Sequence, residues 1–137
     1  MRMAIAALFA AAVLQNSLPM RSLDQGQESR VDVAKQVTAR TADEWDALWK
    51  QHGSGRARPS VDFSKEVVAA VFLGSRPSAG FNVQIVGARQ DGSALVVSYK
   101  ETRPAPDALT AQILTSPYHI VAIPKGTATE VKFERVS

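Results

Sequence analysis

The chain has 137 residues, of which 45% are hydrophobic and 21% are charged, and its formal net charge is +3. This length and balance are typical of one globular domain with a single hydrophobic core. The 16 Lys and Arg residues are interleaved with 13 Asp and Glu residues, so no basic patch favours nucleic-acid binding.

The sequence contains no cysteine. This excludes disulfide bridges, a cysteine nucleophile and a thiolate metal site. We also expect no lipid anchor on cysteine. The stability of the domain must therefore come from its hydrophobic core.

The N-terminus has the pattern of an export signal. Arg2 precedes an apolar run from Ala4 to Leu14, which is shorter than the roughly 20 residues that span a bilayer. Such a run is typical of a secretory signal peptide. We expect a signal peptide over residues 1–17 and a periplasmic or secreted mature protein without a membrane span. The alternative is an apolar first helix packed on the domain.

The next residues predict a linker and then a first strand. Residues 18–29 are polar or small and show no period, so we expect a linker there and a domain over residues 30–137. In the segment RVDVAKQVTAR, the valines Val31, Val33 and Val37 indicate a strand whose alternation is broken at Lys35.

Residues 41–53, TADEWDALWKQHG, predict a short amphipathic helix. Thr41 and Glu44 have the spacing of a capping box, and Gly53 suits the helix end. Trp45 and Trp49 fall on one face with Leu48 between them. Two indoles on one face favour anchoring in the core, and the alternative is a wall of a ligand site.

The middle of the chain predicts strands. The run VVAAVFL, residues 67–73, is apolar at every position, which indicates a strand covered on both faces. The turn SRPSAG follows it. Residues 81–101 alternate on both sides of Asp91-Gly92, which predicts a β-hairpin.

The remaining residues predict shorter extended pieces. Residues 102–110 have the composition of a loop, and AQIL, YHIVAI and TEVKFERV follow at 111–114, 118–123 and 129–136. The whole pattern predicts an α+β fold. It has a mostly antiparallel β-sheet of about six strands and one short amphipathic helix near the N-terminus of the domain.

Ser116 and His119 are close together in LTSPYHIVAIPKG, which raises the question of a serine nucleophile beside its base. A nucleophile needs its base within hydrogen-bond reach, and Pro117 favours an extended residue before it. No G-x-S-x-G motif is present. We therefore expect His119 to be hydrogen-bonded or solvated at the start of a strand.

Other catalytic and metal-binding patterns are absent from the sequence. It holds two histidines, His52 and His119, and contains no H-E-x-x-H, EF-hand or phosphate-binding loop motif. The prediction is a protein that is not an enzyme and that uses no cofactor or metal. An enzyme with His119 as its lone base is the competing hypothesis.

Four segments together resemble the PrcB C-terminal domain family. They are VDFSKEVVAAVFLGSRPSAGFNVQI, residues 61–85, the hairpin after it, the Pro-rich PAPD and the run TSPYHIVAIP. Upstream, EWDALWKQH is similar to the segment that precedes that domain. The resemblance extends from about residue 30 to the C-terminus. It implies a non-catalytic module that associates with a protease outside the cytoplasm and stabilises or regulates it.

The resemblance also implies where a protein partner binds. The family's glycine-rich turn corresponds to residues 74–81, but here Ser78 stands for Thr, Ala79 for Gly and Phe81 for Tyr. The second motif falls on residues 115–118. The expected partner contacts are Arg76, Pro77, Ser78, Gly80, Phe81, Thr115, Ser116, Pro117, Tyr118 and His119.

Two routes to a protein partner fit these residues: a Pro-stiffened loop in a protease cleft, or an exposed sheet edge paired with an extended segment. The alternative function is a periplasmic small-ligand or envelope-binding domain without a protease partner, in which Trp45 and Trp49 line the ligand site.

Overall fold

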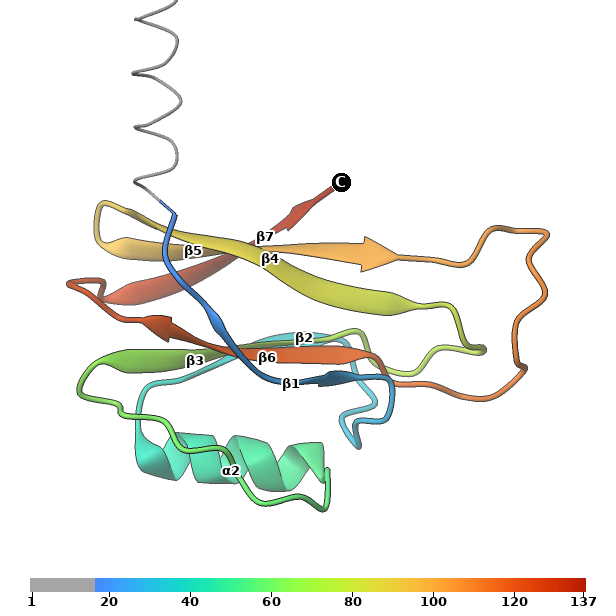
Figure 1. Ribbon diagram of the computed structural model, residues 1–137, viewed down its shortest axis with the longest axis horizontal. Coiled ribbons are helices and arrows are strands. Elements are labelled where there is room, and N and C mark those ends of the chain that lie inside the picture. The colour runs from blue at the N-terminus through green and yellow to red at the C-terminus, as the bar shows by residue number, and fades with distance from the viewer. Residues whose placement is uncertain (1–16) are drawn as a thin grey trace, which may run out of the picture.

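The computed structural model describes residues 17–137, which form three layers (Figure 1). A helix covers one face of a first sheet, and a second sheet covers the other face. The elements are β1 (Arg21–Gly26), β2 (Lys35–Ala39), α2 (Ala42–His52), β3 (Glu66–Phe72), β4 (Asn82–Asp91), β5 (Ala94–Thr102), β6 (Tyr118–Pro124) and β7 (Glu130–Val136).

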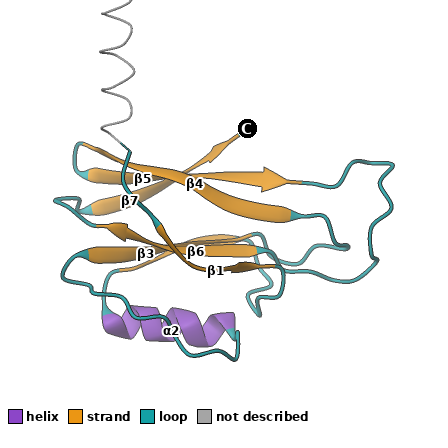
Figure 2. Ribbon diagram, viewed as in Figure 1, coloured by secondary structure: helices purple, strands orange, loops and turns teal. Residues whose placement is uncertain are grey.

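The strands divide into two sheets (Figure 2). The first has the order β1-β6-β3-β2 and is antiparallel throughout. The second has the order β4-β5-β7, with β4 antiparallel and β7 parallel to β5. The predicted α+β class with mostly antiparallel pairing is confirmed. Alternation along a strand does not specify which sheet it joins, so the division into two sheets was not predictable.

The central strands β3 and β6 are buried on both faces, as the unbroken apolar run of β3 predicted. Val68, Ala70 and Phe72 of β3 pack toward α2. Ala69 and Val71 pack toward the second sheet. The molecule therefore has two hydrophobic layers that share the first sheet as their common wall.

Helix α2 begins and ends as its sequence predicts. The side chain of Thr41 accepts a hydrogen bond from the amide of Glu44 at 3.1 Å. The Glu44 carboxylate in turn accepts from the amide of Arg40 at 2.9 Å, one residue before the cap. Gly53 takes a left-handed φ of 65°, and its amide donates to the carbonyl of Trp49.

Both indoles of α2 are anchored in the core, as expected. Trp45 and Trp49 are buried with Leu48 against the first sheet. Burial of an indole removes about 150–250 Å² from water, which contributes roughly 4–6 kcal/mol per side chain before entropic costs. This anchoring fixes the helix and the residues that follow it.

The hairpin is also confirmed. Strands β4 and β5 pair from Asn82–Thr102 to Asp91–Ala94, and Gly92 occupies a left-handed turn position with φ 60°. The register shifts between Ile85 and Gly87, which marks a bulge in β4. This bulge lies where β4 faces β6.

Two local predictions are wrong. Residues 21–26, expected in a linker, form β1 and pair with β6 from Arg21–Ala122 to Gly26–Tyr118. The first predicted strand starts late, at Lys35, and Val33 is exposed. At residues 111–114, where AQIL predicted a short strand or an extended piece, no strand forms and no turn or bend interrupts the chain.

The N-terminal part of the described chain connects the two sheets. The amide of Leu18 donates to the carbonyl of Ala88 in β4, and β1 then joins β6. The side-chain amides of Gln25 and Gln27 donate to the carbonyls of Val83 and Phe81. This strap, residues 17–27, covers the outer edge of β4. The predicted signal peptide, residues 1–17, lies outside the described residues except for Ser17.

Gly74 offers a sharp test of the packing after β3. Its φ is 77°, and a Cβ there would lie 2.7 Å from the amide nitrogen of Ala34. We predict that Gly74→Ala destabilises the fold by at least about 1–3 kcal/mol, the usual cost of a left-handed non-glycine residue.

The matched control is Gly87→Ala, because a Cβ on Gly87 meets no atom within 4 Å. Urea denaturation at neutral pH measures both variants. Equal unfolding midpoints for the two variants would contradict the close contact between Gly74 and the backbone of Ala34.

Candidate functional site

Two loops meet at one end of the sandwich, where β3 leads to β4 and β5 leads to β6 (Figure 1). They comprise residues 73–81 and 103–117, and together they are the loop pair. The amide of Arg76 donates to the carbonyl of Thr115 at 2.7 Å, and the amide of Thr115 donates back at 3.0 Å. The two segments expected to contact a partner therefore lie side by side.

Further contacts hold the loop pair together. The amide of Ala79 donates to the carbonyl of Ala111 at 3.0 Å. Gly80 lies so close to Pro104 that a Cβ on it would come within 2.8 Å of the proline ring. The guanidinium of Arg76 stands 5.8 Å from the ring centroid of Phe81, within range of a cation–π contact. Substitution of Ala79 for the family's glycine needs no left-handed backbone here.

The second loop displays three large apolar side chains. Leu109 is fully exposed, and Leu114 and Ile113 are 81% and 58% exposed. No turn or sharp bend interrupts residues 108–114. Loops longer than about 12–15 residues without secondary structure are uncommon in compact domains and are usually functional or disordered. Backbone bonds tie this one to its neighbour, which favours a functional surface.

The structure divides the ten expected contact residues into two groups. Half have exposed surface, and these are Arg76, Pro77, Gly80, Phe81 and Ser116. The other half are buried, and these are Ser78, Thr115, Pro117, Tyr118 and His119. The hydroxyl of Thr115 donates to the carbonyl of Ser78 at 3.0 Å. The buried residues therefore shape the loop pair from beneath.

His119 and Ser116 are not hydrogen-bonded to each other. The Nδ1 of His119 accepts from the amide of Ile85 at 2.8 Å, and its Nε2 lies 3.0 Å from the hydroxyl of Ser22. Ser116 uses its backbone to pair with Gln27 and Ser29. The expectation of a hydrogen-bonded histidine near the start of the strand is confirmed.

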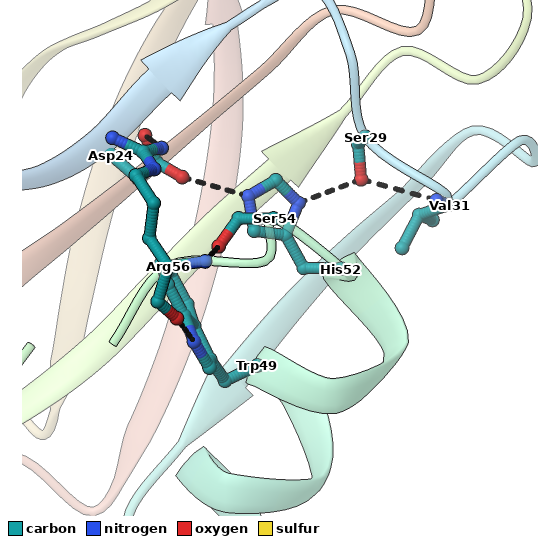
Figure 3. Close-up of polar contacts among 7 residues, drawn as sticks. All are labelled: Asp24, Ser29, Val31, Trp49, His52, Ser54 and Arg56. Carbon is teal, nitrogen blue, oxygen red and sulfur yellow. Dashed lines mark hydrogen bonds and ion pairs between the residues drawn. The ribbon is translucent and has the colours of Figure 1, made fainter. Parts of the chain in front are cut away.

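A second polar cluster, which the sequence did not indicate, lies between α2 and the first sheet (Figure 3). His52 is completely buried, and its Nε2 donates to the Asp24 carboxylate at 2.8 Å. Its Nδ1 is hydrogen-bonded to the hydroxyl of Ser29 at 2.8 Å. That hydroxyl oxygen also accepts from the amide of Val31 at 3.1 Å.

Asp24 is the centre of this cluster. Arg56, from the loop after α2, donates to its other carboxylate oxygen. Burial alone raises the pKa of Asp24, but hydrogen bonds from His52, Arg56 and Tyr118 outweigh it and leave the pKa lowered. Burial and the Asp24 carboxylate raise the pKa of Tyr118 to about 12. Asp24 is therefore ionised, and the Tyr118 phenol is neutral, at physiological pH.

Ser29, His52 and Asp24 follow the order of a nucleophile, its base and an orienting acid, and this raises the question of catalysis. A substrate carbonyl must reach the serine oxygen, yet Ser29 is 8% exposed and His52 0% exposed. The serine oxygen already accepts a backbone amide. In this conformation the cluster joins β1, the helix end and residues 29–31, which is an architectural role.

The indole nitrogens of Trp45 and Trp49 also make structural hydrogen bonds. The Nε1 of Trp45 donates to the carbonyl of Pro59 at 2.9 Å, and the Nε1 of Trp49 donates to the carbonyl of Arg56 at 3.0 Å. The hollow beside Trp45 has a volume of about 170 Å³, whereas small-molecule sites usually have about 300–1,000 Å³. These bonds secure the 53–60 loop over the helix.

Two further observations concern the described residues alone. Within residues 17–137, no three His, Asp or Glu side chains gather in a way that would hold a metal ion. Within the same range, no helix has both the length and the apolar character needed to cross a bilayer.

The Asp24 cluster can be tested by substitution. Removal of one partner from a buried ion pair commonly costs about 3–5 kcal/mol, and we predict a loss of about 3 kcal/mol for Asp24→Asn at pH 7. Because the pKa of Asp24 is lowered in the folded state, its contribution is fully present above the unfolded value of 3.8. The contribution disappears as the pH falls below that value.

Urea denaturation of wild type and variant at pH 7 and pH 3 measures this contribution. Asp46→Asn is the matched control, because Asp46 is an exposed residue that pairs with Lys50 and Arg58 on the surface. A deficit in Asp24→Asn no larger than that in Asp46→Asn, or one that persists unchanged at pH 3, would contradict the assignment.

Residues 67–124 match the family model described as PrcB C-terminal. The match covers β3 to β6 and so includes the whole loop pair, but it is shorter than the expected resemblance from about residue 30. No curated protein and no solved structure matches the chain at a significant level. The predicted resemblance to the PrcB C-terminal family is confirmed over residues 67–124, the part of the chain that the family model matches.

Proposed function

We propose that the protein is an exported, non-catalytic binding module that associates with an extracytoplasmic protease and stabilises or regulates it. The observation that carries this proposal is the exposure of Leu109, Ile113 and Leu114 on one loop. That loop lies inside the segment that matches the PrcB C-terminal family.

The loop pair has the features of a recognition surface. Complete burial of an aliphatic side chain contributes about 1.5–3 kcal/mol, so three of them can supply the apolar centre of an interface. Beside them, Arg76 is held over Phe81 and supplies a residue type that is enriched at such centres. Prolines at 104 and 106 and the backbone bonds to residues 76 and 79 reduce the entropy lost on binding.

The non-catalytic part of the proposal is supported by the state of the two histidines. His119 is buried with both ring nitrogens engaged, and so is His52. Neither faces the loop pair with a free nitrogen. Export is supported by Arg2 and the apolar run that follows it in the sequence.

The surface can be removed without disturbing the core. We predict that the triple variant Leu109→Ser, Ile113→Ser, Leu114→Ser loses at least about 90% of protease capture, because each change removes apolar area that only a partner covers. The assay is affinity purification of tagged protein from the exported fraction, with proteases identified by mass spectrometry. The thermal midpoint should stay within about 2 °C of wild type, since exposed substitutions rarely change stability.

The matched control is the double variant Val33→Ser, Val86→Ser, which removes exposed valines outside the loop pair. It should retain wild-type capture. If the triple variant still captures a protease as wild type does, or if the control loses capture equally, the loop pair is not the binding surface.

A further inference from the structure

The ring of His119 connects the two sheets beneath the loop pair. His119 belongs to β6 of the first sheet, whereas Ile85, whose amide it accepts at 2.8 Å, belongs to β4 of the second. The side chain is buried. Ile85 lies four residues after Phe81 and His119 two residues after Pro117, so the bond joins the two strands close to where the loops leave them.

This bond supplies a hydrogen-bond partner to a backbone group on the outer edge of β4, where other groups are already paired. The carbonyl of Val83 accepts from Gln25, and the carbonyl of Ala88 accepts from the amide of Leu18. Between them, at the bulge, the outward-facing amide of Ile85 has His119 as its acceptor. A buried amide without an acceptor costs about 1–3 kcal/mol, so the ring meets a requirement that the bulge creates.

The geometry fixes the protonation of the ring. Because the Ile85 amide donates, Nδ1 must carry a lone pair and no hydrogen. The hydrogen of the neutral ring is then on Nε2, which donates to the hydroxyl of Ser22 at 3.0 Å. A second proton would have to enter at Nδ1, where it would face the Ile85 amide, and two donors would oppose each other.

The groups around His119 do not compensate for the unfavourable contact between a proton on Nδ1 and the Ile85 amide. β3 contributes Val71 opposite the ring, and β4 contributes the Ile85 amide. β1 contributes Ser22, Gln25 and Asp24, of which only Asp24 is charged. Burial lowers the pKa of His119, and the Asp24 carboxylate raises it by a smaller amount. The Asp24 carboxylate itself is occupied by His52 and Arg56.

We infer that His119 is a pH-operated clamp between β4 and β6: neutral, it holds the base of the loop pair closed, and acidification releases it. The direction follows from proton binding. The pKa in the folded state lies below the unfolded value of 6.5, so the unfolded chain binds more protons as the pH falls through that value. The contribution of the clamp is therefore complete above about pH 6.5 and is lost below it.

The test compares wild type with His119→Asn, whose side-chain oxygen can accept from the Ile85 amide and does not titrate. Thermal midpoints are measured at pH 7.5 and pH 5.5, above the range of about 3.9–4.3 in which exposed carboxylates titrate. We expect the thermal midpoint of wild type to fall by several degrees between pH 7.5 and pH 5.5. The midpoint of the variant should fall by less than half as much. His52 is unchanged in both proteins.

A second measurement keeps the inference testable if the variant does not fold. In wild type, nitrogen-15 spectra of the imidazole at pH 7.5 should show an unprotonated Nδ1, and the Ile85 amide signal should shift together with the ring as the pH falls. A protonated Nδ1 at pH 7.5, or an equal loss of stability in wild type and variant, would overturn the clamp. Neither measurement needs a partner, so failure of the proposed protease association is a separate result.

Discussion

The Asp24 carboxylate is buried at the point where β1, β6, the end of α2 and the loop after α2 meet. An ionised carboxylate in such a place is tolerated only if donors surround it. His52, Arg56 and Tyr118 supply them from three different segments. The need to satisfy this one charge therefore fixes β1 in the first sheet and holds the 53–60 loop over the helix.

The position of β1 in turn determines how the edge strand β4 of the second sheet is covered. Because β1 pairs with β6, Gln25 and Gln27 reach the carbonyls on the outer edge of β4, and Ser22 meets His119. An uncovered edge strand is a site of unwanted pairing with other chains. Here the strap covers that edge, and the route to a partner by strand addition at β4 is closed in this conformation.

The polar groups inside the protein are fully used, and this sets the interior apart from the loop pair. Within residues 17–137, every buried side-chain nitrogen or oxygen has a hydrogen-bond partner. Both histidines, the residues that most often perform acid–base chemistry, belong to this satisfied interior. On the loop pair, by contrast, the apolar side chains of Leu109, Ile113 and Leu114 stay exposed to water, although similar residues elsewhere in the chain are buried.

Local signals in the sequence predicted the elements that local physics determines. The Thr41–Glu44 spacing and Gly53 specified α2, because a helix end is satisfied by residues within one turn of it. The apolar run of β3 and the Asp91-Gly92 turn were equally informative. The family resemblance pointed to two loop segments as partner contacts, and the structure shows that these segments lie side by side.

Other features depend on distant partners and could not be predicted. β1 has a polar sequence, and the side chains of Gln25 in β1 and Gln27 just after it donate to residues 58 and 54 positions away. The position of His52 fits an exposed side chain near a helix C-terminus, but in the structure it is buried and hydrogen-bonded to a carboxylate 28 residues earlier. The apolar residues of AQIL left a short strand and an extended loop as alternatives, because composition alone does not distinguish the two.

We propose that a partner is recognised at the loop pair, whereas the polar interior has an architectural role. Site-specific photo-crosslinking tests it most directly, with a photoreactive phenylalanine at Ile113 in one protein and at the exposed Val33 in another. If the protein associates with a protease as proposed, we expect the probe at 113 to become covalently joined to that protease and the probe at 33 not to react with it. A protease joined mainly through position 33, or one that co-purifies without reacting at 113, would contradict it.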